Sequence, residues 1–142
     1  RFLKKQPGVD PTRVYLGGHS TGGTLALIAG ALAGDEVAGI IAMGPVADPQ
    51  DYGSDQPFEG SNPNEVELRK PIRYLQALEA SVLVVEGEAG NADAARRLGR
   101  SAGGDRLDIV IVEGADHFDY LHAAHRQIAE RLLETGKLAF EP

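Results

Sequence analysis

Four short apolar segments alternate along the chain with four segments of helical pattern. The apolar segments read as β-strands and are RVYLGG (13–18), VAGIIAMGPV (37–46), SVLVVEG (81–87) and LDIVIVEG (107–114). The helical patterns cover residues 21–33, 65–78, 92–99 and 119–134, with Pro71 starting or kinking part of the second. This β-α-β-α-β-α-β-α order predicts right-handed crossovers and a parallel sheet between helical layers. We therefore expect an α/β fold with three α/β/α layers and a mainly parallel sheet.

Composition limits the size and the partners of this fold. The 142 residues fit a single domain over 1–142, with a 25% charged fraction that is ordinary for a globular protein. A formal net charge of −7 argues against nucleic acid or an anionic membrane as the main partner. No apolar run reaches the length that spans a bilayer.

The absence of cysteine favours a reducing compartment, and we expect a cytoplasmic protein. The sequence starts at Arg1, on a stretch that resembles the end of a helix, so an upstream signal peptide stays open as an alternative.

One serine lies between glycines where the first predicted strand meets the first predicted helix. Residues Gly18-His19-Ser20-Thr21-Gly22 match the pattern G-x-S-x-G. A tight strand-to-helix turn of this kind exposes the serine hydroxyl at the carboxyl edge of a parallel sheet, where reactive crevices form. The following helix start adds backbone N–H groups and a positive dipole end. We favour a catalytic Ser20 over a merely structural turn.

A serine hydroxyl needs a base, and the sequence offers four histidines. His117 follows the fourth predicted strand and precedes the last helix, so the fold brings it to the same edge as Ser20. His19 is expected to point away from the crevice and to pack. His122 and His125 lie at i, i+3 on the last helix, but no third ligand is evident, so a solvated face is favoured over a metal site. We predict His117 as the base, with no metal and no cofactor.

Together these segments resemble the C-terminal half of an α/β-hydrolase. The resemblance rests on VDPTRVYLGGHSTGG, GPVAD, SVLVVEGEAGN and VEGADHF, and is nearest to the prolyl oligopeptidase and dienelactone-hydrolase-like serine hydrolases. It implies a Ser–His–acid triad acting by acyl transfer on a small-molecule ester or peptide. Ser20 would be the nucleophile, His117 the general base and later acid, and the Thr21 N–H one oxyanion donor.

The acid of that triad departs from the family pattern. Members usually carry G-x-x-D after the strand matching 81–87, and this sequence has Gly87-Glu88-Ala89-Gly90-Asn91. Glu88 is the first choice for the acid and Asp48 the second, while Asn91 could orient the imidazole without charge. Glu88 could equally be solvated and Asn91 an N-cap. A site of serine and histidine alone stays open, as does a non-catalytic domain that binds a ligand or protein.

The length departs as well, because only the last four strands of the family fold are predicted. The earlier strands and the loop that supplies a second oxyanion N–H are missing. The resemblance therefore implies a fragment of a longer hydrolase whose main partner is the N-terminal half of the domain. Alone, the chain is expected to be nearly inactive and to expose a sheet edge at 13–18.

Residues 48–64 form a polar stretch after the second predicted strand. The stretch is expected to be too polar to pack as an element, and a solvated surface loop is its first interpretation. The functional alternative is a lid or specificity loop in which Tyr52 and Phe58 contact the substrate. Its acidic residues Asp48, Asp51, Asp55 and Glu59, with no basic residue between them, would disfavour anionic substrates.

Overall fold

The computed structural model describes residues 2–54, 56, 58–103 and 107–142, and its described residues form one sheet of four parallel strands in the order β1-β2-β3-β4. The strands are β1 (Tyr15–His19), β2 (Gly39–Met43), β3 (Ser81–Gly87) and β4 (Leu107–Val112). The α-helices are α1 (Thr21–Ala33), α2 (Pro63–Leu68), α3 (Ala92–Ala102) and α4 (Leu121–Thr135). Short 3-10 helices are η1 (Leu3–Lys5), η2 (Gly34–Glu36), η3 (Pro49–Tyr52), η4 (Pro71–Arg73) and η5 (Leu75–Ala77).

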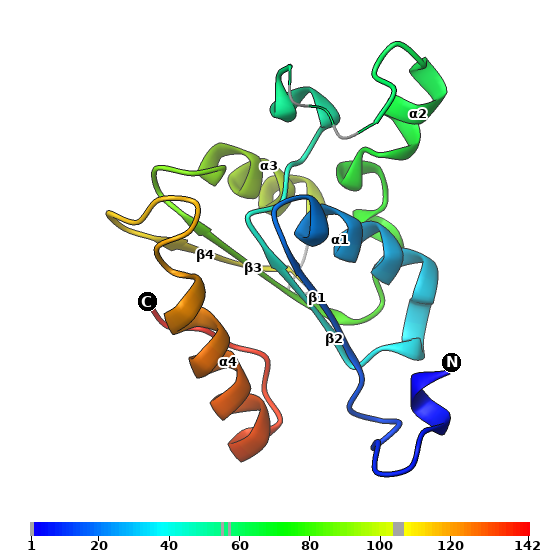
Figure 1. Cartoon of the computed structure of the whole chain (residues 1–142), viewed down its shortest axis with the longest axis vertical. Helices are drawn as coiled ribbons and strands as arrows, with labels where there is room; N and C mark the ends of the chain where they lie inside the picture. Colours follow the sequence, from blue (N-terminus) through cyan, green and yellow to red (C-terminus); the bar gives the residue numbers. More distant parts are fainter. Residues whose placement is uncertain (1, 55, 57, 104–106) are drawn as a thin grey trace.

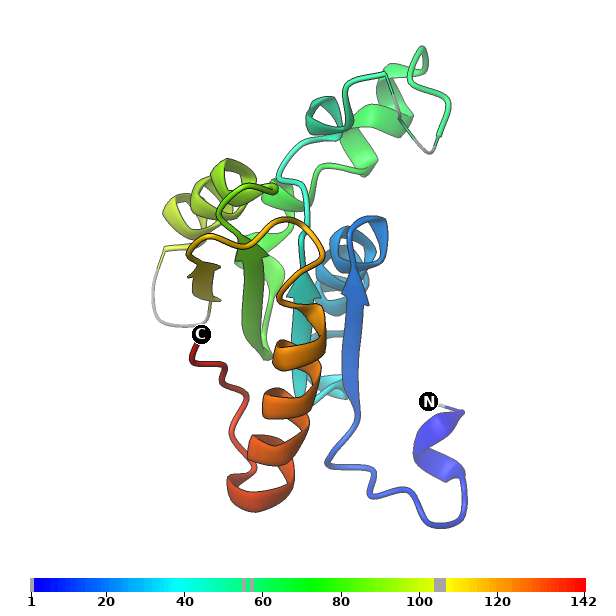
Figure 2. The same cartoon turned by 60° about the vertical axis from the view of Figure 1, so that its left-hand side comes forward.

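Helices cover both faces of the sheet, which confirms the predicted α/β class (Figures 1 and 2). On one face, α1 and α3 pack against alternate strand residues such as Ile40 and Val84. On the other face, α4 packs against Met43, Leu83 and Val85. Successive strand side chains point to opposite faces, so a strand covered on both sides is mostly apolar, as β2 and residues 82–85 of β3 are.

The strand register brings the carboxyl ends of the strands to one edge. His19 pairs with Met43, Met43 with Val85, and Gly87 with Val112. The residues that follow these positions therefore meet above the same edge of the sheet. Ser20, Gly44 and the loop after β4 all lie there.

The connection between β2 and β3 differs from the expectation. The stretch 48–64 is not too polar to pack, because it contains η3 with a buried Pro49 and the start of α2. Asn62 caps α2 by accepting from the Asn64 and Glu65 N–H groups, so this helix begins at Pro63 rather than at residue 65. The helical pattern predicted over 65–78 is broken into α2, η4 and η5. Pro71 starts η4, since a proline lacks the N–H that a continuing helix needs.

Candidate active site

Ser20 sits in a strained turn between β1 and α1. Its φ of 56° and ψ of −121° make it the one non-glycine residue with positive φ in the described part of the chain. Such a conformation costs about 1–3 kcal/mol and persists only where the surroundings enforce it. Two backbone hydrogen bonds do so here: the Ser20 N–H donates to the Met43 carbonyl at 2.8 Å, and the Thr24 N–H donates to the Ser20 carbonyl at 3.0 Å. The turn is thereby fixed to both β2 and α1.

Gly18 explains why this turn needs a glycine before the serine. A Cβ at position 18 would lie 2.4 Å from the Gly22 backbone, so the first turn of α1 approaches β1 too closely for any side chain there. Thr21 begins α1, and N–H groups in a first helical turn have no acceptor within the helix.

His117 lies on the loop between β4 and α4, and the fold brings it beside the turn of Ser20. A Cβ on Gly44, which has a φ of +61°, would fall 2.4 Å from His117 Cε1, so the imidazole rests on the Gly44 backbone. Gly44 follows Met43, the register partner of His19. His117 and Ser20 thus stand over neighbouring strand ends. The described contacts contain no hydrogen bond between the Ser20 hydroxyl and His117.

The imidazole of His117 has a buried carboxylate partner, Glu86. His117 Nδ1 lies 2.9 Å from Glu86 Oε2, and the Glu86 side chain is 0% exposed. Glu86 also accepts from the Gly87 N–H at 2.7 Å and from the Asn91 N–H at 3.0 Å. A buried carboxylate is tolerated when such donors replace its hydration. Glu86 is therefore a fixed acceptor aimed at one nitrogen of His117.

Tyr120 lies near enough to Glu86 for the charge of this carboxylate to affect the Tyr120 hydroxyl. Its hydroxyl donates to the Val85 carbonyl at 3.2 Å. Burial, reinforced by the negative charge of Glu86, raises the pKa of Tyr120 well above its usual range.

The two residues predicted as the acid lie elsewhere. Glu88 is exposed, and its carboxylate accepts from the Gly114 N–H at 3.2 Å. Asp48 caps η3 by accepting from the Gln50 N–H at 3.0 Å, and its other oxygen lies 3.4 Å from Lys70 Nζ. The structure thus places Glu86, and neither Glu88 nor Asp48, against the imidazole nitrogen.

Glu86 was not considered as a partner of His117 because the acid was sought in the loop after β3, whereas Glu86 is still within that strand. A signal was present in the sequence: Glu86 is the one charged residue in SVLVVEG, a run otherwise suited to full burial.

Asn91 occupies the N-cap position of α3, as expected, but its side chain makes no capping hydrogen bond. Its amide donates to the Gly44 carbonyl at 3.1 Å, while its backbone N–H holds Glu86. Asn91 therefore joins the loops after β2 and β3 and does not take the imidazole contact considered for it.

The other histidines divide into two groups. His19 packs, but against His117 rather than away from the site, with ring centroids 4.5 Å apart. His122 and His125 are exposed on α4, and His125 Nδ1 lies 2.7 Å from the Leu121 carbonyl. Within the described ranges, no three His, Cys, Asp or Glu side chains gather as metal ligands.

The stretch 48–64 borders the helix that carries Thr21. The Tyr52 hydroxyl donates to Thr24 Oγ1 at 3.2 Å, and Phe58 lies under the Arg69 guanidinium at 5.0 Å. A shallow hollow beside the strained turn is lined by Thr21, Thr24, Leu25, Ile28, Tyr52, Phe58 and Arg69.

Basic residues from other elements offset the acidic side chains of this stretch. Asp51 pairs with Arg97 at 2.5 Å, and Asp48 lies near Lys70. Asp55 lies outside the described residues. The expected repulsion of anions is thus weakened by pairs that the local sequence did not reveal.

A family model described as the alpha/beta hydrolase fold matches residues 2–139. The chain belongs to the α/β-hydrolase fold family. A comparison of the sequence with curated proteins gave no match. In the described part of this α/β-hydrolase chain, every helix is too short or too polar to cross a membrane.

Solved structures of low sequence identity share the fold. Pyrococcus horikoshii acylaminoacyl peptidase is similar with a TM-score of 0.76 and 18% identity, over 99% of this chain and 27% of that one. Porphyromonas gingivalis dipeptidyl peptidase 4 is similar with a TM-score of 0.74 and 19% identity, over 93% of this chain and 21% of that one. Est1E from Butyrivibrio proteoclasticus is similar with a TM-score of 0.69 and 20% identity, over 94% of this chain and 64% of that one. This α/β-hydrolase chain therefore spans about a quarter of the peptidases and just under two thirds of Est1E.

Proposed function

We propose that this chain carries the catalytic centre of a serine hydrolase that cleaves small-molecule esters or peptides by acyl transfer. Ser20 is the nucleophile, His117 the general base and Glu86 the acid that orients it. The observation that carries the proposal is the 2.9 Å contact between His117 Nδ1 and the fully buried Glu86. A buried carboxylate on a histidine that is 20% exposed, beside a strained serine, has little structural purpose.

The geometry supports a specific division of work. A carboxylate only accepts, so the Glu86 contact requires the hydrogen of neutral His117 to be on Nδ1. Nε2 is then the basic nitrogen that takes the Ser20 hydroxyl proton as Oγ bonds to the substrate carbonyl carbon. Glu86 stabilises the imidazolium that results. Catalytic hydrogen bonds are often long in free enzymes and tighten with substrate, which accommodates the absent Ser20–His117 bond.

The remaining steps complete the transfer. The carbonyl oxygen becomes an oxyanion, for which the Thr21 N–H is one donor at the positive end of α1. Collapse of the intermediate breaks the bond to the alcohol or amine, which leaves with the proton from His117 Nε2. Water then attacks the carbonyl carbon of the acyl-Ser20 ester and gives its proton to His117 Nε2. The bond between that carbon and Ser20 Oγ breaks, Oγ takes the proton back from His117, and the acid product departs.

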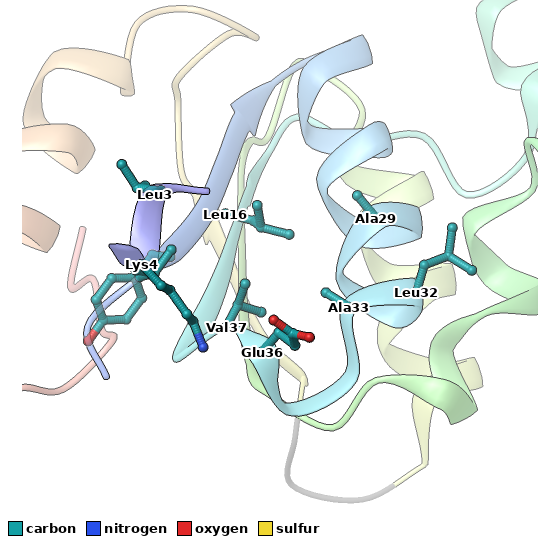
Figure 3. Close-up of a pocket in the computed structure, with 10 residues that line it drawn as sticks. Leu3, Lys4, Leu16, Ala29, Leu32, Ala33, Glu36 and Val37 are labelled. Carbon is teal, nitrogen blue, oxygen red and sulfur yellow. The ribbon is translucent and has the colours of Figure 1, made fainter. Parts of the chain in front are cut away.

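A second oxyanion donor is proposed to come from further strands of the same protein that pair with β1. β1 is an edge of the sheet, and apolar hollows flank it on both faces. The larger, of about 480 Å³, lies between β1, η1 and α1, where Figure 3 shows Leu16, Ala29 and Ala33 around it. Its residues lie at the start of β1 and the end of α1, away from Ser20, so it suits packing rather than substrate.

The test is covalent labelling by a fluorophosphonate probe of the full-length protein that contains this chain. We expect labelling in the wild type and none in Ser20→Ala or in the denatured protein. A non-catalytic binding domain was the alternative because no acid was apparent, and Glu86 removes that reason. Absence of labelling in a folded wild-type protein would restore it.

A further inference from the structure

His19 packs against the ring of the candidate base and ends the strand that leads to the candidate nucleophile. It is the last residue of β1 and directly precedes Ser20. Its register partner is Met43, whose side chain belongs to the core on the α4 side, which is also the side of the His117 loop. A histidine at this point can therefore reach the loop without leaving the sheet.

The His19 ring makes a hydrogen bond to the backbone of this loop. His19 Nε2 lies 3.0 Å from the His117 backbone carbonyl. Because a carbonyl oxygen only accepts, His19 Nε2 carries a hydrogen and is the donor. Among the described residues, this is the hydrogen bond that joins β1 to the loop between β4 and α4.

Ring contacts add to that bond. The His19 ring is tilted by 41° to the His117 ring, and Phe118 meets the two rings edge-on at 5.2 and 5.0 Å. Phe118 is nevertheless 63% exposed, so burial of Phe118 does not hold the loop in place. His19 and His117 are partly buried, and Phe118 is the exposed member of the three rings.

Two separate anchors thus hold His117. Glu86, from β3, holds the imidazole by Nδ1, and His19, from β1, holds the backbone of the same residue. The start of the loop is tied to the β3–α3 connection, where the Ala89 N–H donates to the Ala115 carbonyl at 3.0 Å. Among the described contacts, neither Glu86 nor Ala115 makes a hydrogen bond to β1, and the path from Glu86 to Ser20 runs through β2, by way of the Gly44 N–H on the Val85 carbonyl and the Ser20 N–H on the Met43 carbonyl. The His19 bond is the direct link between His117 and β1.

We propose that His19 is a positioning residue that sets the distance between Ser20 and His117. The inference rests on the proposed function. His19 touches neither reacting atom; it acts by tying the base's backbone to the strand that ends in the nucleophile. A misplacement of about 1 Å can cost about 10²-fold in rate, so loss of this tie should lower kcat with little change in KM.

A matched pair of variants isolates the donor. The amide nitrogen of glutamine stands as many bonds from Cβ as His19 Nε2 does, while that of asparagine is one bond shorter. In the full-length protein, His19→Gln should keep kcat for p-nitrophenyl acetate within about 3-fold, whereas His19→Asn should lower it about 10- to 100-fold. His122→Gln, on the exposed face of α4, is the control. Thermal melting establishes that each variant is folded.

A second measurement does not depend on activity. The His117 Nδ1–H proton should give a downfield NMR signal because it is hydrogen-bonded to Glu86, and Glu86→Gln should remove that signal. In His19→Asn its exchange with water should be at least about 10-fold faster than in His19→Gln, because the loop opens more often. Equal exchange and equal kcat in His19→Gln and His19→Asn would overturn the positioning role. If the wild type neither labels nor hydrolyses, the proposed function fails, and the exchange comparison alone decides the role of His19.

Discussion

At the scale of single residues, conformational strain and a buried charge meet at one edge of the sheet. Ser20 is held at positive φ by backbone bonds to Met43 and Thr24. Glu86 is held without solvent by the N–H groups of Gly87 and Asn91. Both features cost stability, and neither is needed to form the sheet. Their placement beside His117 is the pattern expected where stability is lost in favour of chemistry.

Glu86→Gln should lower kcat for p-nitrophenyl acetate about 10²- to 10⁴-fold, because the imidazole would lose its charge partner and its fixed tautomer. Glu88→Gln is the matched control, since Glu88 is exposed and contacts the Gly114 N–H instead. Steady-state kinetics on the full-length protein would measure both variants. A collapse in Glu88→Gln with normal activity in Glu86→Gln would return the role of the acid to Glu88.

Ser20→Gly should abolish fluorophosphonate labelling and yet stabilise the fold by about 1 kcal/mol, because glycine adopts a φ of 56° without strain. The expected rise in Tm is about 2–4 °C above that of Ser20→Ala, which removes the hydroxyl but keeps the strain. Calorimetry on both variants measures the difference. Equal Tm values would mean that the turn stores no strain.

At the scale of elements, the loop after β2 leaves room for the imidazole of His117, the proposed base. Gly44 has a φ of +61° and faces His117, while Gly53 has a φ of +59° and its Cβ direction is open. The two glycines share a similar positive φ and differ in what a methyl group would meet. Comparing alanine at the two positions therefore separates the effect of backbone strain from the effect of displacing the His117 imidazole.

Gly44→Ala should lower kcat at least about 10-fold because its methyl group would displace the imidazole, whereas Gly53→Ala should leave kcat unchanged. Both should lose roughly 1 kcal/mol of unfolding free energy, since alanine is strained at this φ. Urea unfolding and kinetics together test the pair. A similar loss of activity in both variants would show that the effect comes from the backbone alone.

Tyr120, at the start of α4, makes the stability of the fold depend on pH. Its pKa is raised in the folded state by burial and by Glu86. Its contribution to stability is therefore fully present below the pKa of the unfolded chain, about 10, and is lost as the pH rises above it. Between pH 9 and 11 the Tm of the wild type should fall more steeply than that of Tyr120→Phe. Parallel curves would contradict this assignment.

The sequence predicted the elements better than it predicted their ends and contacts. Alternation of apolar and amphipathic segments was enough for the strands, because β2 and β3 are apolar on both faces. The β2–β3 connection was misread because its packing depends on distant partners, such as Arg97 for Asp51. The same holds for the site: the motif around Ser20 is local, but the partner of His117 is set by the register of β3 and β4.

At the scale of the whole molecule, the sheet is open at β1. Leu25 and Leu32 of α1 are 48% and 78% exposed, and hollows of about 480 and 310 Å³ border the strand on its two faces. An unpaired parallel edge strand with apolar surface on both sides is suited to pairing with another strand. Further strands of the same protein remain the proposed occupant.

The isolated chain should hydrolyse p-nitrophenyl acetate about 10²- to 10³-fold more slowly than the full-length protein, the loss expected for one missing oxyanion donor. Equal concentrations of the two proteins, each with its Ser20→Ala variant as the blank, give the comparison. Equal rates that both depend on Ser20 would show that the four described strands suffice for the reaction.

The sequential strand order has a consequence for biosynthesis. Each parallel strand can add beside the one made just before it, so the sheet can grow in the direction in which the ribosome releases it. Ser20 emerges with the first of these strands, and His117 only after the last. A nascent or truncated chain therefore bears Ser20 before it contains His117, the proposed base. Reactivity at Ser20 would then report that the final strand and its loop have docked, and so would distinguish finished molecules from unfinished ones.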